Sequence, residues 1–474
     1  MALGITSAAG QKAYWRRNIR SAVSYDFPEG AAPLTALMSL MEPGNDTPVP
    51  EFGWPEERYV SIQTKTQVAT QPTAGVTFYQ EGGTTTSGAP TTVALGTNLR
   101  VYVDDVSNLQ VDDIIQIPQV ALTSGSDILV GRITALGAGT NAGTKWVEFA
   151  PQNVPLGVTA TVLNTSGANA GKTVFLAGSA YLEGSKSRKG RSTVPLEVKN
   201  YVQLQLNAFA LTSYALQAPT IYNKSGEYQK RLKYNGIVHL EGLEKTTIFG
   251  QRGPITTEND ADSGDPMLRY TTGGILWYLK QWELGSSGDI GYTHVNGTDD
   301  LTAVPRADWE LYPDKRIIQL DSATITKSQF NRLTARPFEK INSMTRDKLV
   351  LCGPDYLTKV AECFEKQVTW TSLRETGNVG WDFQLLKHQS NAGTVYYKVH
   401  PLFQHPVYRS CALYLDLGWL VWRPLANHDT QVMTNVQPKG VLYRKDQYLT
   451  AGGIEVGFPE AHMWVENLGG ITGV

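Results

Sequence analysis

The sequence predicts an α+β protein that carries a small inserted β domain. Three observations lead to this fold class. Short β-type runs recur at intervals of about ten residues in the segment 92–165, one long stretch of helical periodicity lies downstream, and helical and strand patterns alternate over residues 326–366. A length of 474 residues allows one large core with insertions, or about two to three domains.

Residues 1–50 have the composition of an arm rather than of a domain. Proline and glycine are frequent, and the single short helical stretch begins at Pro33 and ends near Glu42. A segment of this kind has no core of its own. If it is ordered, contacts with the rest of the chain or with another subunit must order it.

The inserted β domain is expected over residues 81–169. It begins at the Gly/Thr-rich stretch EGGTTTSGAPTT and ends at the stretch NTSGANAGKT, and β-type segments precede and follow it. Its short runs are separated by Gly, Asn, Asp and Ser, which is typical of a small sandwich or barrel.

Two long elements follow. In NYVQLQLNAFALT, the alternation that includes Leu204 and Leu206 predicts a long half-buried strand. The segment 225–253 then changes to a helical period, and Gly250 is expected to end the helix. The residues expected on one helical face are Tyr228, Leu232, Gly236, Leu240 and Leu243.

The rest of the chain mixes both element types. Helices are expected in GGILWYLKQWE, KSQFNRLTARPFEKINS and DYLTKVAECFEKQ, and a buried strand in KLVLCG. The last ~90 residues again have strand patterns. The helices and the buried strand predict an α/β arrangement around a small sheet.

Charge argues against nucleic-acid binding as the main task. Charged residues make up 18% of the chain, and 42 Lys and Arg nearly balance 44 Asp and Glu, giving a net charge of -2. A dedicated nucleic-acid binder or a polybasic membrane protein needs a surplus of Lys and Arg, whereas this balance suits a surface covered by neighbouring subunits. No signal peptide and no membrane-spanning helix are expected.

No recognisable catalytic, cofactor or metal motif is present, so we expect a protein that is not an enzyme. The three cysteines include no C-x-x-C pair and are expected to be reduced thiols. The segment Gly167–Thr173 resembles a phosphate-binding loop but has one residue too few between its glycines, which favours a plain turn. Asp260, Asp262 and Asp265 lack the glutamate that a calcium loop requires and are expected in a solvated loop.

Two basic clusters are the candidate interface residues. The first is Trp15, Arg16, Arg17 and Arg20, and the second is Lys186, Arg188, Lys189 and Arg191. Either cluster can be a solvated loop, or it can bind an acidic neighbouring subunit or a nucleic-acid backbone. Because Trp15 has no local core to pack on, an arm laid along a neighbour is the favoured interpretation for the first cluster.

The order of these parts resembles that of tailed-phage major capsid proteins, and more narrowly of a major head protein family with a β insertion. The matching parts are PLTALMSLM, EFGWPEERYVSIQT, the insertion, FLAGSAYLEGSKSRKGR, the long strand, the long helix, TTGGILWYLK and KLVLCGPDYLTKVAECFE. Two family motifs stand here as Asn200-Tyr201-Val202-Gln203 and as the segment from Glu244 to Phe249-Gly250.

The resemblance implies the Hong Kong 97-type capsid fold. The expected parts are an N-terminal arm at 1–50, an extended β-hairpin loop at 51–80 and 170–200, a peripheral domain at 201–325 with a spine helix at 225–250, an axial domain at 326–425, and strands at 426–474 that return to the peripheral domain. A chain of this fold obtains its free energy of assembly from contacts with neighbouring copies.

The implied function is the icosahedral head shell of a tailed double-stranded DNA phage, assembled in the host bacterial cytoplasm. Implied partners are copies of the chain in hexamers and pentamers, scaffolding, portal and possible decoration proteins, and enclosed DNA bound without sequence specificity. Cofactors and membranes are not expected. A β-rich tail or surface-adhesion protein and, less in keeping with the motifs, a carbohydrate-active enzyme are the alternatives.

Overall fold

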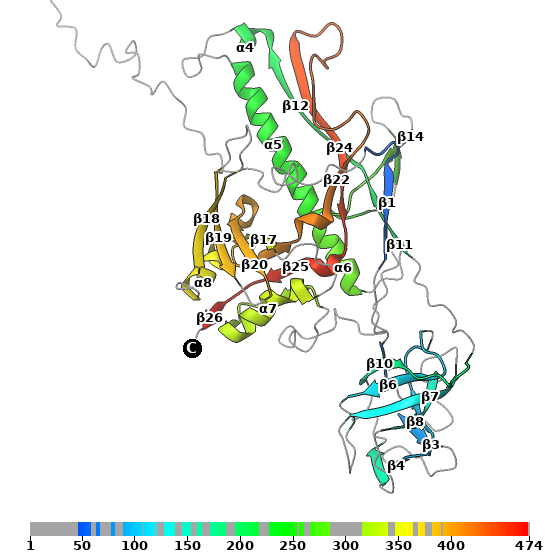
Figure 1. Ribbon diagram of the computed structural model, residues 1–474. Coiled ribbons are helices and arrows are strands. Elements are labelled where there is room, and N and C mark those ends of the chain that lie inside the picture. Colours follow the sequence, from blue (N-terminus) through cyan, green and yellow to red (C-terminus); the bar gives the residue numbers. More distant parts are fainter. Residues whose placement is uncertain are drawn as a thin grey trace, which may run out of the picture. The chain divides into compact units, whose positions relative to one another are not determined.

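The computed structural model describes residues 46–57, 63–66, 77–80, 89–106, 108–118, 120, 128–137, 145–152, 159–163, 171–185, 195–217, 227–253, 256–259, 266–284, 315–339, 347–363, 368–374, 382–389 and 392–472 (Figure 1). Contacts divide them into two compact units. The β unit contains the described residues of 55–197, and the main unit contains those of 46–54, 198–284 and 315–472.

The β unit is built on a seven-stranded antiparallel sheet. Its strand order is β2 (Gln63–Lys65), β10 (Thr173–Ser179), β6 (Asp113–Ile117), β7 (Leu129–Gly137), β8 (Trp146–Pro151), β5 (Leu99–Tyr102) and β3 (Phe78–Gln80). β4 (Pro90–Ala94) and β9 (Thr159–Leu163) form a separate antiparallel pair. Alternate side chains are buried, among them Ile115 and Ile117 of β6, as expected for strands with one face on a core.

This sheet extends beyond the segment 81–169. β2 and β3 come from residues 51–80 and β10 from residues 170–200, where an extended loop is the expectation. Phe78 of β3 and Val174 of β10 belong to the same buried cluster as Ile115. The β unit therefore needs strands from both sides of the insertion to complete its core.

The first sheet of the main unit has the order β12 (Gln203–Thr212), β24 (Tyr443–Val456) and β22 (Leu420–Pro424), with β23 (Gln431–Met433) also paired to β24. The helix α5 (Glu227–Phe249) packs against β12 and β24, and Figure 1 shows them side by side. Its bounds agree with the helix expected at 225–250. β11 (Leu196–Tyr201) leads into β12 and pairs with β1 (Glu51–Glu56).

The faces of these two elements differ from the expectation. Leu204 and Leu206 lie on the exposed face of β12, at 56% and 50% exposure. On α5, Leu240 is 38% exposed, and His239 is buried in the face that packs on the sheet. The predicted apolar faces were therefore wrong at these positions, because polar side chains make the contacts between the helix and the sheet.

The second sheet of the main unit is mixed and carries the larger core. Its order is β15 (Ile317–Gln319), β25 (Met463–Glu466), β21 (Ala412–Leu415), β17 (Asp347–Cys352), β20 (Thr394–Val399), β19 (Asp382–Gln389) and β18 (Val368–Arg374). β17 is parallel to β20 and antiparallel to β21. The helices α7 (Lys327–Glu339) and α8 (Pro354–Cys363) pack side chains onto it, which confirms the α/β arrangement expected from the sequence.

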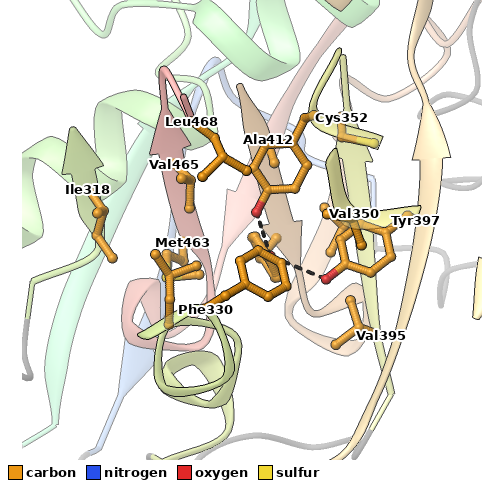
Figure 2. Close-up of a cluster of buried hydrophobic side chains, with 14 of the residues drawn as sticks. Ile318, Phe330, Val350, Cys352, Val395, Tyr397, Ala412, Met463, Val465 and Leu468 are labelled. Atoms are coloured by element: carbon orange, nitrogen blue, oxygen red, sulfur yellow. Dashed lines mark hydrogen bonds between the residues drawn. The ribbon is translucent and has the colours of Figure 1, made fainter. Parts of the chain in front are cut away.

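Figure 2 shows this core, in which Phe330 of α7 and Met463 of β25 lie among buried aliphatic side chains. The Tyr414 hydroxyl contacts the hydroxyls of Tyr356 and Tyr397 at 2.9 and 3.5 Å. Burial raises the pKa of each of these phenols well above its ordinary value. Strand β25 joins this sheet, whereas β24 from the same C-terminal segment joins the sheet beside α5.

Shorter elements complete the main unit. The helices are α4 (Ser213–Gln217) and α6 (Ile275–Leu284), and the 3-10 turns are η2 (Pro401–Gln404), η3 (Leu417–Trp419) and η4 (Pro459–Ala461). The paired strands are β13 (Thr256–Asn259) with β14 (Pro266–Arg269), and β16 (Thr324–Thr326) with β26 (Gly470–Thr472).

Candidate functional site

The residues predicted to form interfaces lie outside the described part of the chain. They are Trp15, Arg16, Arg17 and Arg20 of the arm, and Lys186, Arg188, Lys189 and Arg191 of the basic run. Their role stays a prediction. The described chain begins at Asp46, and Thr47 hydrogen-bonds the edge strand β22 through its N–H to the Pro424 carbonyl at 2.9 Å.

The segment that resembles a phosphate loop is a turn where the structure describes it. The Gly171 and Lys172 N–H groups donate to the carbonyl and hydroxyl of Thr66, and Thr173 begins strand β10. A phosphate loop needs a helix at this point, so the plain turn is confirmed. Asp260, Asp262 and Asp265 lie outside the described residues.

The described residues contain neither a metal-binding cluster nor a membrane-spanning helix. No group of three or more His, Cys, Asp or Glu side chains there is arranged to hold a metal ion. Likewise, no helix in the described ranges has the length and apolar character needed to cross a membrane.

Asn200, from the first family-type motif, joins three elements. Its buried side-chain amide donates to the carbonyls of Gly273 and Ile454 at 3.1 and 2.7 Å, and its oxygen accepts the Gly273 N–H at 2.9 Å. Gln203 accepts the N–H of Thr272 at 3.2 Å. These bonds fix the turn that precedes α6 against β11, β12 and β24, so the motif has a structural role.

The second motif ends α5 and ties it to the second sheet. Glu244 and His400 form a buried pair with 2.7 Å between Oε1 and Nε2. The other ring nitrogen of His400 accepts the Leu402 N–H at 3.1 Å, so Nε2 carries the proton donated to Glu244. At Gly250, a Cβ would lie 2.8 Å from the Thr272 carbonyl oxygen, which explains why glycine ends the helix.

Polar contacts hold α5 on the first sheet. The hydroxyls of Tyr228 and Tyr448 donate to Asp446 and to the Leu232 carbonyl at 2.7 and 3.0 Å. His239 Nε2 lies 2.7 Å from the hydroxyl of Thr450, and burial lowers the pKa of this histidine. Because each bond joins one turn of the helix to one strand position, this row sets the helix register on the sheet.

A buried ion pair lies within the second sheet, between Lys348 of β17 and Asp416, which follows β21. Lys348 Nζ is 2.6 Å from Asp416 Oδ2, and neither side chain is exposed. Burial lowers the pKa of Lys348 even though Asp416 acts in the opposite direction. His462 accepts the Asp416 N–H at 3.2 Å, and burial, with the nearby Lys348 charge, lowers its pKa to about 4.

A second buried carboxylate holds the start of the same sheet. Glu283, in the last turn of α6, accepts the N–H groups of Arg316, at 2.7 Å, and Ile317. Burial raises the pKa of Glu283 to about 7, against the effect of these hydrogen bonds. The Arg316 guanidinium in turn donates to the Glu460 carbonyl at 2.8 Å.

These buried charges are not among the residues predicted from the sequence. Lys348 begins an apolar strand run and Asp416 stands between two leucines, so an isolated charge inside a strongly apolar run was the available signal. The pairing itself joins residues far apart in the chain and cannot be read from spacing. These contacts join helices and strands of the main unit to one another.

The chain matches a family model described as SU10 major capsid protein over residues 30–469. A comparison with curated proteins gives no match.

Three solved structures that match the chain do so with low sequence identity and low TM-scores. The holo-SrpI encapsulin complex from Synechococcus elongatus PCC 7942 is 11% identical, with 58% of this chain and 76% of that chain covered and a TM-score of 0.31. The structure of Mycobacterium phage Bobi is 8% identical, with 99% and 100% covered and a TM-score of 0.36. The capsid of a native GTA particle is 8% identical, with 98% and 100% covered and a TM-score of 0.36.

Proposed function

Since this chain belongs to the SU10 major capsid protein family, we propose that its copies assemble as pentamers and hexamers into the icosahedral head of a tailed phage. The chain is a structural protein of the phage head shell. The observation that carries this conclusion is the family match over residues 30–469, which includes both the β unit and the main unit. The shell encloses double-stranded DNA and is assembled in the host bacterial cytoplasm.

The two sheets of the main unit suit the two parts of a shell tile. We assign α5 with β12, β24 and β22 to the peripheral domain, and the mixed sheet with α7 and α8 to the axial domain. The Glu244–His400 pair supports one rigid tile, because it joins the helix of the first part to the second part through a fully buried contact. A rigid tile is needed for identical copies to close a shell.

The arm and the basic run supply contacts between tiles in this proposal. Trp15 with Arg16, Arg17 and Arg20, and Lys186 with Arg188, Lys189 and Arg191, are unfavourable in an isolated subunit and become favourable beside acidic neighbours. The chain has no catalytic role, and its further partners are scaffolding, portal and possible decoration proteins. The segments 51–80 and 170–200 serve as the extended loop.

The experiment compares three proteins: the parent, a deletion of residues 1–25, and Arg188→Glu with Arg191→Glu. We expect both variants to remain folded, by circular dichroism, and to fail to form stable shells in electron micrographs. The deletion removes mainly packing, so its defect should persist at high salt. Charge contacts should make assembly of the parent salt-sensitive. Shells as heat-resistant as the parent's from a protein carrying both changes would refute the role of these segments.

A further inference from the structure

The outward face of strand β12 is apolar, although the outward face of a sheet within one subunit is normally polar. Leu204 and Leu206 are 56% and 50% exposed, and Ala208 and Ala210 follow on the same face. Leucines on a strand normally face the core, with polar residues toward solvent. Here the leucines lie on the face away from α5.

This orientation is fixed by contacts on the other face. Gln205 donates to the Thr246 hydroxyl of α5 at 2.7 Å, and Gln203 accepts the Thr272 N–H at 3.2 Å. β12 is also paired with β24 over ten successive residues without a bulge. A shift by one residue would break these bonds, so the leucines are held outward.

β12 is also an edge strand without the usual protection. In the part of the chain that the structure describes, it pairs only with β24. Its sequence QLQLNAFALT has no charged residue and no proline, the residues with which proteins prevent edges from pairing with other chains. An apolar face and an available edge therefore occur on the same strand.

Two more exposed apolar side chains lie beyond the end of this strand. Tyr214 of α4 is 88% exposed and Leu442, which precedes β24, is 85% exposed. They are neighbours there, because the N–H of Ser213 donates to the Leu442 carbonyl at 3.3 Å. We call Leu204, Leu206, Tyr214 and Leu442 the β12 surface.

We propose that the β12 surface is covered by a second copy of this chain. The inference rests on the proposed function, since a shell made from many copies of one chain places another copy beside every subunit. The chemistry fits an apolar protein segment better than a nucleic acid, because the exposed leucines and alanines of β12 are apolar and uncharged and the cation beside them, Lys445 of β24 opposite Ala210, lies at the end of the strand away from the leucines. Near the start of the described residues, Thr47 is bonded to β22 at the opposite edge of this sheet, and the Pro50 carbonyl accepts the Val202 N–H just before β12.

The test replaces Leu204 and Leu206 by Gln in the full-length chain, with Met at both positions as the matched control. Gln removes the apolar contact, and because positions 204 and 206 are exposed in the subunit, the change should not unfold it. Met keeps the apolar contact. We expect the Gln variant to melt like the parent as an unassembled subunit and to lose about tenfold or more in shell yield. The Met variant should assemble like the parent.

A photo-crosslinking residue at position 206 identifies the occupant. We expect covalent dimers of this chain from assembled particles and none from unassembled subunits. A crosslink to a different virion protein, or none in shells, would overturn the inference. So would Gln-variant shells with the parent's yield and heat resistance. Those outcomes leave the proposed function intact, whereas a parent that forms no shells would refute the function itself.

Discussion

Replacing Asp416 by Asn should strongly destabilise the main unit by leaving a lysine charge buried. In the native pair, Lys348 Nζ lies 2.6 Å from Asp416 Oδ2 with both side chains fully buried. After the replacement, the ammonium keeps only the Ala461 carbonyl, at 3.3 Å. Asn preserves the volume and the oxygen that caps η3 by accepting the Gly418 N–H, so the variant removes mainly the charge.

Two arguments set the size of the loss. Removing one partner of a buried ion pair costs about 3 to 5 kcal/mol. The lysine can limit this cost by losing its proton, which from an ordinary pKa of 10.5 costs about 5 kcal/mol at pH 7. We therefore expect the free energy of unfolding at pH 7 to fall by about 3 to 5 kcal/mol.

The same reasoning predicts the pH dependence of the defect. As pH rises above 7, losing the proton comes to cost less than burying the charge. The folded variant then holds a neutral lysine while the unfolded state still binds a proton, so stability rises with pH. The loss in free energy of unfolding relative to the parent should shrink by up to about 1.4 kcal/mol per pH unit between pH 7 and the pKa of lysine in the unfolded state.

The assay is urea unfolding of the unassembled subunit, followed by tryptophan fluorescence at pH 7 and pH 9. A double variant, Lys348→Met with Asp416→Asn, removes both charges and should recover most of the loss, because Met packs against neighbouring Phe338. A loss below about 1 kcal/mol at pH 7, or a loss that does not change with pH, would refute the reasoning.

Three further predictions follow from the described contacts. Burial raises the pKa of Glu283 from an ordinary 4.5 to about 7, so the folded state binds this proton more tightly than the unfolded state. The free energy of unfolding should therefore fall by about 3 kcal/mol as pH rises from about 4.5 to about 7. In Glu283→Gln the urea midpoint should no longer fall over this pH range. It should instead rise with pH, because the pKa of His462 is lowered to about 4 in the folded state. Gly250→Ala should cost about 1 to 3 kcal/mol, because the new Cβ would lie 2.8 Å from the Thr272 carbonyl; calorimetry of the unassembled subunit measures this. Deleting 58–194 should leave a soluble main unit in size-exclusion chromatography, whereas deleting only 92–165 should cause aggregation because it uncovers Phe78 and Val174.

Local periodicity was enough to predict the main elements of the main unit. The helix α5 was expected at 225–250 and spans Glu227–Phe249, since helical spacing and a terminal glycine act within the segment itself. The choice of its buried face failed at one position. Leu240 has the greater hydrophobicity, but His239 is buried because it bonds Thr450 of β24.

The features that the sequence did not predict depend on contacts between segments far apart in the chain. Leu204 and Leu206 satisfy the pattern of a buried strand face, yet the face is chosen by Gln205 and its bond to Thr246. The Lys348–Asp416 pair joins strand β17 to the residue that caps η3, which no spacing in the sequence indicates. A subunit that buries surface against other copies also breaks the rule that apolar faces lie inside the chain.

Electron cryomicroscopy of particles formed by the full-length chain tests the central claim most directly. The chain should be expressed alone and with a scaffolding protein, and the particles reconstructed without imposed symmetry. The account predicts closed icosahedral shells in which every pentamer and hexamer is built from this one chain. A monodisperse monomer at high concentration under every salt and scaffold condition, or fibres in place of closed shells, would contradict it.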